Sequence, residues 1–197
     1  MNYMNELRSI AEKNGGIINN KVAAEHGISR VMLSKLCKDN KIQRISQGQY
    51  IPSGEMQDEL LSISMRSDFF VFSHETALFL HGISDRTPFE HTITAPSEKI
   101  PSKAIREECK VYFIKPELFD MGKTVLTTPF GNKVAGYDLE RTICDIVRSR
   151  NKIGTETFFS ALKMYAASSK KDLNKLNAYA TKMKIAGIVR KYIEVLL

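Results

Sequence analysis

Cysteines and long apolar runs are both scarce in this sequence of 197 residues. The three cysteines, Cys37, Cys109 and Cys144, lie far apart and show no Cys-x-x-Cys spacing, so we expect neither a disulfide framework nor a zinc site. No stretch approaches the roughly 18 consecutive apolar residues that a membrane-spanning helix needs. Glu6 and Arg8 also interrupt the N-terminus before any apolar run of signal-peptide length. We therefore expect a cytoplasmic protein without membrane contact.

The sequence motifs of several enzyme classes are missing as well. There is no glycine-rich phosphate loop, no P-loop lysine and no Gly-Ser plus paired-aspartate pattern of a nucleotidyltransferase. His74 and His81 are seven residues apart, whereas a metalloprotease helix places its two histidines four apart. Glu140, Arg141 and Asp145 fall on one predicted helix, where local ion pairing is favoured over catalysis. We expect no catalytic residue, no cofactor and no metal ion.

Acidic residues are few at the two ends of the chain. Residues 1–54 hold 8 Lys and Arg against 4 Asp and Glu, and residues 150–197 hold 10 against 3. Residues 55–149 hold 11 against 15, so the middle of the chain is acidic. Basic ends favour a polyanionic partner, although a lysine-rich helix is as often a solvated surface. The 43% of apolar residues can form a hydrophobic core, which excludes a disordered chain.

The first 54 residues predict a helix-turn-helix. Apolar residues at helical spacing indicate a helix over residues 2–13, a short second helix that stops at Gly27, and a third helix from the capping Ser29 to about Asn40. Ala23 lies four residues before Gly27, which supplies the small side chain needed where two such helices touch. Glycine is favoured in the turn because the backbone there adopts a positive φ. The alternative is an ordinary helical hairpin with a glycine turn.

The third helix carries the candidate DNA-contacting residues. If Leu33 and Leu36 face the core, the opposite face is free to enter a major groove. Arg30 could make a bidentate contact with guanine, and Val31 could meet a thymine methyl group. For each of these residues a solvated surface position remains the alternative. The predicted contacts of this helix are Ser29, Arg30, Val31, Ser34, Lys35 and Lys38.

Residues 41–52 predict a small β-hairpin around a Ser-Gln-Gly turn. A hairpin directly after a recognition helix is the wing of a winged helix. Its tip, with Arg44, Gln47 and Gln49, is expected to lie against the DNA backbone or minor groove. Tyr50 is expected to pack on the core.

A domain boundary is predicted at residues 52–54, where a Pro-Ser-Gly cluster follows the wing. The predicted fold class is α+β, with a winged helix-turn-helix over residues 1–54 and a mixed α/β domain over residues 55–197 that ends in a helical tail. In the second domain we expect helices over 55–66 and 73–82 and one capped by Asp138, strands over 69–72, 91–95, 111–114, 123–128 and 133–136, and terminal helices over 155–167, 172–183 and 187–197.

The helical tail offers a second candidate surface. Lys171, Lys175 and Lys182 recur at intervals of four and seven residues, which predicts one basic face on one helix. Such a face could extend a DNA footprint, or it could be an amphipathic helix in water. The residues predicted for this basic face are Lys163, Lys170, Lys171, Lys175, Lys182 and Lys184.

Two runs in the first domain resemble a known family. Gly-Ile-Ser-Arg-Val-Met-Leu-Ser-Lys-Leu and Ile-Gln-Arg-Ile-Ser-Gln-Gly-Gln-Tyr are similar to the N-terminal domain of the AbiEi-type antitoxins, whose Gly-x-Tyr after the wing turn is matched by Gly48 and Tyr50. With less specific motifs, residues 72–82 resemble the family's strand-to-helix entry. Residues 137–145 resemble its Asp-x-Glu-Arg-Thr helix. The resemblance thus spans the chain.

The resemblance implies an antitoxin that is also a transcriptional repressor. Members of this family belong to the AbiE abortive-infection systems of bacteria, which are type IV toxin-antitoxin systems used in phage defence. The first domain would repress the operon by binding repeats in its own promoter. The second would counteract a nucleotidyltransferase-like toxin without forming a stable complex. One alternative is a standalone transcription factor whose second domain senses a ligand or a protein, and a third hypothesis is a nucleic-acid-processing enzyme.

Overall fold

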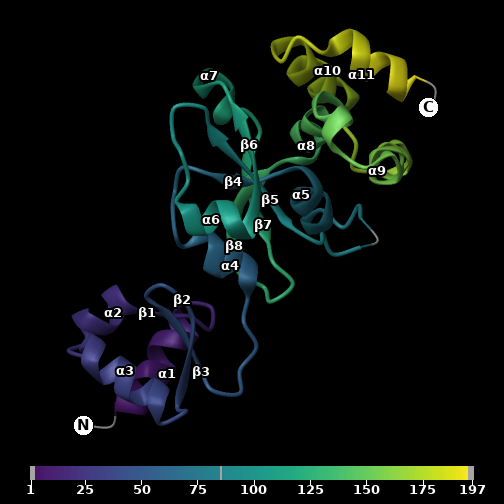
Figure 1. The fold of residues 1–197 in the computed structure, drawn as a ribbon. Coiled ribbons are helices and arrows are strands. Elements are labelled where there is room, and N and C mark those ends of the chain that lie inside the picture. The colour runs from purple at the N-terminus through teal and green to yellow at the C-terminus, as the bar shows by residue number, and fades with distance from the viewer. Residues whose placement is uncertain (1–2, 85, 195–197) are drawn as a thin grey trace. The chain divides into compact units, whose positions relative to one another are not determined.

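The computed structural model describes residues 3–84 and 86–194 and divides into two compact units (Figure 1). The first unit comprises Met1–Arg66 together with Thr128–Asn132, and the second comprises Ser67–Thr127 together with Lys133–Leu197. The first unit therefore extends past the boundary predicted at residue 54. Within the described part of the chain, no helix has the length and apolar character needed to cross a bilayer.

The first unit is a winged helix, as predicted. Its sheet has the order β1-β3-β2, with both pairs antiparallel. The strand β1 and its pairing with β3 were not predicted, because two residues are too few for a periodic signal. In chain order the elements are α1 (Tyr3–Lys13), β1 (Ile18–Asn19), α2 (Asn20–Glu25), α3 (Arg30–Lys38), β2 (Ile42–Ser46), β3 (Gln49–Pro52) and α4 (Glu59–Ser64). Residue 2, where the first predicted helix begins, lies outside the described residues.

Local signals explain where these helices begin and end. Asn19 caps α2 by accepting a hydrogen bond from the Lys21 amide, and Ser29 caps α3 by accepting one from the Met32 amide. Gly27 lies between them with φ +73°, a conformation that favours glycine. The core beneath the helices is apolar and includes Leu7, Ile10, Ala11, Ile18, Ala23, Ile28, Leu33, Leu36, Ile42 and Tyr50.

The helix α4 belongs to the first unit because of a buried carboxylate. Asp58 caps α4 through the Leu61 amide and is only 3% exposed. Its other oxygen accepts hydrogen bonds from the Thr128 hydroxyl at 2.6 Å and the Asn132 amide at 2.8 Å. The Asn132 amide also donates to the Gly15 carbonyl. The segment 128–132 therefore packs with residues seventy or more positions earlier, which no local sequence pattern predicts.

The second unit is built on a five-stranded mixed sheet of order β6-β5-β4-β8-β7. The pairs β4–β8 and β5–β6 are parallel, and the pairs β4–β5 and β7–β8 are antiparallel. Its elements are β4 (Val71–Phe72), α5 (His74–Leu80), β5 (His91–Pro96), α6 (Lys103–Glu108), β6 (Cys109–Ile114), α7 (Pro116–Phe119), β7 (Lys123–Thr127), β8 (Lys133–Tyr137), α8 (Leu139–Arg148), the 3-10 helix η1 (Arg150–Lys152), α9 (Thr155–Ala167), α10 (Leu173–Lys182) and α11 (Ala186–Ile193).

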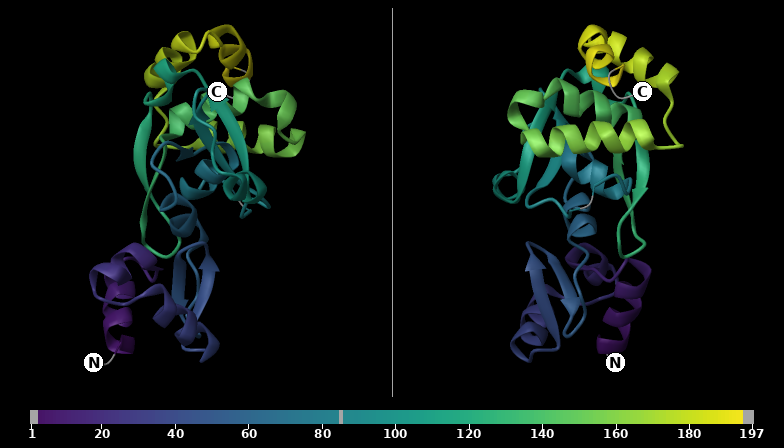
Figure 2. Two further views of the ribbon diagram at one scale, coloured as in Figure 1. Left: turned by 60° about the vertical axis from the view of Figure 1, so that its left-hand side comes forward. Right: turned by 90° about the vertical axis from the view of Figure 1, so that its right-hand side faces the viewer.

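The helix α8 is the centre of this unit. All of its residues from Leu139 to Val147 are buried, including charged ones. Asp138 caps it through the Arg141 amide, as predicted. Apolar residues of α9, α10 and α11 pack against α8, and Figure 2 shows these helices gathered on one side of the sheet.

Several details differ from the predicted elements of this unit. The short helices α6 and α7 were not expected, because each is less than two turns long. Ser73 stands at the N-cap position of α5, but its side chain makes no capping hydrogen bond. Its hydroxyl instead accepts from the Thr94 hydroxyl, and the next residue, His74, has φ +46°. The last predicted helix was extended to residue 197, and residues 195–197 lie outside the described part.

Candidate nucleic-acid interface

The helix α3 separates a buried face from an exposed face. Leu33 is fully buried and Leu36 is 6% exposed, so both anchor the helix to the core. Val31, an apolar side chain, is 80% exposed on the outer side. The predicted contacts Ser29, Arg30, Val31, Ser34, Lys35 and Lys38 are all exposed. The structure therefore brings all six onto the solvent side of α3.

The packing of α2 against α3 fits a helix-turn-helix. Ala23 is fully buried, and Ile28 directly after the turn is 1% exposed. The Ile28 amide donates to the Ala23 carbonyl at 2.9 Å, which closes the turn. Because α3 is followed at once by the hairpin of β2 and β3, the unit has the order of a winged helix and not that of a plain helical hairpin.

The charge on α3 suits a polyanion. Its first turn contains no acidic residue, and its last turn contains Lys35 and Lys38. Among the described residues, the side chains of Arg30, Lys35 and Lys38 make no hydrogen bond or ion pair. These three cations are therefore available to phosphate oxygens or base edges.

The wing tip has two exposed polar residues from the prediction. Arg44 and Gln47 are exposed, and the Arg44 Nε donates to the Ser46 carbonyl at 3.2 Å. Gly48 has φ +76° in the turn, and its carbonyl accepts from the Asn20 amide at 2.8 Å. This bond fixes the wing tip against the start of α2.

The prediction for Gln49 is wrong. Its side chain is 3% exposed and accepts hydrogen bonds from the Ser46 hydroxyl at 2.7 Å and the Ser62 hydroxyl at 2.6 Å. Its Nε2 donates to the Ser62 carbonyl at 3.1 Å. Every residue of β3 is buried, and for Gln49 the covering partner is Ser62 of α4. Gln49 therefore positions the wing and cannot contact DNA.

The basic face predicted on the helical tail is only partly present. Lys171 precedes α10 and donates to the Ser168 carbonyl. Lys175 forms ion pairs with Asp138 at 3.0 Å and Glu140 at 3.8 Å. The hydrogen bond to the Asp138 carboxylate raises the pKa of Lys175. The Lys175 ammonium therefore already has a partner within the second unit. The exposed lysines of the predicted face are Lys163, Lys170, Lys182 and Lys184.

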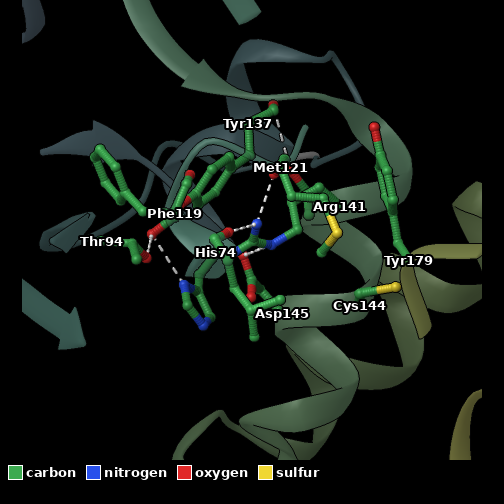
Figure 3. A network of polar contacts seen from close by, with 12 residues as sticks. His74, Thr94, Phe119, Met121, Tyr137, Arg141, Cys144, Asp145 and Tyr179 are labelled. Carbon is green, nitrogen blue, oxygen red and sulfur yellow. Dashed lines mark hydrogen bonds and ion pairs between the residues drawn. The ribbon is translucent and has the colours of Figure 1, made fainter. Parts of the chain in front are cut away.

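The buried charged groups of α8 have structural partners. Arg141 is fully buried, and its Nε lies 3.1 Å from an oxygen of Asp145, which is 2% exposed. Its Nη1 donates to the carbonyls of Leu118, in α7, and Met121, just after it, which holds this part of the chain in place (Figure 3). The predicted ion pairing is therefore confirmed for Arg141 and Asp145.

The two histidines of α5 are bound within the fold. His81 hydrogen-bonds to the Tyr137 carbonyl through Nε2, and His74 hydrogen-bonds to the hydroxyls of Ser73 and Ser149. In the part of the chain that the structure describes, no group of three or more His, Cys, Asp or Glu side chains could hold a metal ion.

A known family model matches the winged helix, and a solved structure matches the fold of most of the chain. Residues 5–52 match the family model described as "Transcriptional regulator, AbiEi antitoxin". A comparison with curated proteins finds no match. Among solved structures, the crystal structure of the RV2827C protein from Mycobacterium tuberculosis has a TM-score of 0.71 and 14% sequence identity, over 95% of this chain and 74% of that one. This likeness shows a shared fold. The resemblance predicted from the sequence is thus confirmed over residues 5–52.

Proposed function

We propose that the chain is a bacterial antitoxin that also represses its own operon by binding repeats in the promoter. The exposed face of α3 is the observation that carries the DNA-binding part. Arg30, Lys35 and Lys38 have no side-chain partner among the residues that the structure describes, and the buried Leu33 and Leu36 anchor the opposite face of the helix. The family model matched over residues 5–52 supports the regulatory role. The bound partner is double-stranded operator DNA, read from the major groove by α3.

A gel-shift assay with the intergenic DNA upstream of the gene tests this part. The charge reversals Arg30→Glu and Lys35→Glu should each lower operator affinity by about 100-fold or more. Each variant loses a phosphate or base contact and adds a charge that repels the DNA. Lys103→Glu is the matched control, since it makes the same charge change on α6 at a side chain that is 81% exposed. Equal loss in all three variants would contradict a specific role for α3.

In the antitoxin part of the proposal, the second unit counteracts a toxin that resembles a nucleotidyltransferase. It does so without forming a stable complex with the toxin. Co-expression with the neighbouring gene's product tests it. The full chain is the right reagent, because a fragment that begins at residue 55 separates α4 from its own unit. Arg30→Glu should still rescue growth although it no longer binds the operator. If the wild-type chain binds the operator and fails to rescue, it is instead a standalone transcription factor, with the second unit as a sensor.

A further inference from the structure

A cavity of about 420 Å³ lies in the second unit, at the edge strand β6 and the carboxyl end of α8. This volume is within the usual range of small-molecule sites. Three cationic side chains line it, each from a different element. Lys110 comes from β6, Arg148 from the last turn of α8, and Lys152 from η1. Neither the DNA-binding role nor the ion pairs inside α8 use these three residues.

The cavity has a surplus of positive charge. Asp145 is the carboxylate among its lining residues, and Arg141 already neutralises it at 3.1 Å. Within the described residues, Arg148 and Lys152 form no ion pair. Arg148 is near enough for its charge to act on Asp145, but it forms no ion pair with it. Three cations thus face a single carboxylate at this cavity, which is typical of a site for an anionic ligand.

Lys110 is held in place beside the cavity. Its Nζ donates to the Lys152 carbonyl at 3.0 Å and lies 5.4 Å from the centre of the Tyr112 ring. Burial lowers the pKa of Lys110, but the Tyr112 side chain and then the charges of Glu75 and Glu90 outweigh it, so the pKa is raised overall. Lys110 therefore stays charged, while the two glutamates offset part of its field and leave Arg148 and Lys152 as the stronger anion ligands.

His74 lines the cavity and is held in place by its neighbours. His74 is 2% exposed, stacks on Tyr112 with ring centres 3.6 Å apart, and has both ring nitrogens hydrogen-bonded, to Ser73 and Ser149. Figure 3 shows His74 beside Asp145 and Thr94. Burial lowers the pKa of His74 well below 6.5, and the surrounding cations lower it further. A neutral imidazole whose protonation is opposed by neighbouring cations indicates a positive local field.

We propose that this cavity binds the phosphate group of a small phosphorylated molecule. Arg148 suits a phosphate because its guanidinium can donate two parallel hydrogen bonds, and Lys152 adds a second charge. A phosphate alone fills only part of about 420 Å³. The remaining space borders Val111 and Phe113, and Phe113 is an apolar side chain 43% exposed. An organic group attached to the phosphate can cover that surface.

Titration calorimetry of the full chain, without DNA, tests the site with inorganic phosphate, AMP and adenosine at physiological salt. AMP should bind and adenosine should not, because adenosine lacks the phosphate. AMP binding more tightly than inorganic phosphate supports a phosphorylated organic ligand. Equal affinities support the same phosphate chemistry with free phosphate as the ligand. Binding of adenosine as tight as that of AMP, or no binding of AMP or phosphate at millimolar concentration, would overturn the proposal.

Two substitutions at exposed positions locate the binding. Arg148→Gln and Lys152→Gln should each weaken AMP binding by about ten-fold or more, since each removes a charge-assisted hydrogen bond. Lys163→Gln is the matched control, because it removes one exposed lysine that does not line the cavity. Wild-type affinity in the two cavity variants, or an equal loss in the control, would show nonspecific attraction and reject the site. Since operator DNA is absent, this result is independent of the DNA-binding proposal.

Discussion

At the scale of single residues, Gln49 shows how a polar side chain can stabilise a binding element without touching its ligand. It satisfies two serine hydroxyls and one carbonyl between β3 and α4. Gln49→Ala should lower the free energy of unfolding by about 1–3 kcal/mol, because buried polar groups lose their partners. Gln47→Ala, at the exposed wing tip, should change it by less than about 0.5 kcal/mol. Urea unfolding followed by circular dichroism measures both, and equal values for the two variants would contradict the role of Gln49.

His74 gives the protein a pH-dependent stability. Burial, followed by the charges of Arg141, Lys110, Arg148 and Lys152, lowers its pKa well below 6.5 in the folded state. The unfolded chain therefore binds the proton first, and stability is present above pH 6.5 and is lost as the pH falls below it. Between pH 7.5 and 5.5 the free energy of unfolding should therefore fall because of this group.

The contribution of His74 is isolated by substitution. His74→Gln should remove that part of the pH dependence in urea unfolding at the two pH values, whatever its stability at pH 7.5. Gln47→Ala carries no titratable change and should keep the wild-type dependence. A pH dependence that is unchanged in His74→Gln would show that other groups cause it.

At the scale of elements, substitutions at two glycines distinguish the effect of backbone strain from the effect of packing on stability. A Cβ added at Gly27 or at Gly187 would meet no atom within 4 Å, so neither substitution to alanine causes a clash. Gly27 has φ +73° in the turn before α3, whereas Gly187 lies inside α11. Gly27→Ala should destabilise the protein by about 1 kcal/mol, and Gly187→Ala should stabilise it by up to about 1 kcal/mol. Thermal unfolding of both variants measures the difference, and shifts of the same sign would contradict the assignment of strain to the turn.

The elements also show what the sequence could predict. The helix-turn-helix was predictable because its signals are local: Gly27 for the turn, Ser29 for the cap, and Leu33 with Leu36 for the buried face. The burial of Gln49 was not predictable, because its hydrogen-bond partner Ser62 lies in α4, beyond the end of the hairpin. The basic face predicted on the helical tail was only partly right for a similar reason. Periodicity placed Lys175 on a surface, but it does not show that Asp138 and Glu140, at the start of α8, form ion pairs with it.

At the scale of the whole molecule, the boundary between the units follows contacts and not composition. The strand β3 ends at the Pro-Ser-Gly cluster of residues 52–54, but the next element, α4, still belongs to the first unit. The segment 128–132 then joins the same unit from between β7 and β8. The cavity of the second unit likewise assembles from β6, α8 and η1, and its cations are unremarkable in sequence. Such arrangements depend on long-range packing, which a single sequence without its structure does not display.

The extent of the first unit yields a prediction about truncation. A fragment of residues 1–54 lacks the Ser62 groups that satisfy Gln49, and a fragment of residues 1–66 restores them. Only the full chain adds Thr128 and Asn132, each of which donates to the buried Asp58. We expect stability to rise from the first fragment to the second, with a further gain of about 1.5–3 kcal/mol per restored hydrogen bond to the carboxylate.

Urea unfolding of the two fragments, and of full-length Asp58→Asn, orders these contributions. Asp58→Asn keeps the size of the side chain but removes the charge, so it should lose part of the gain that the full chain has over residues 1–66. Operator binding in a gel shift should follow the same order, because the wing is held by Gln49 and α4 while the contacts of α3 are present in all three proteins. A fragment of residues 1–54 that matches the full chain in both stability and operator affinity would show that α4 and the segment 128–132 are dispensable. The winged helix would then be complete at the boundary that composition alone suggests.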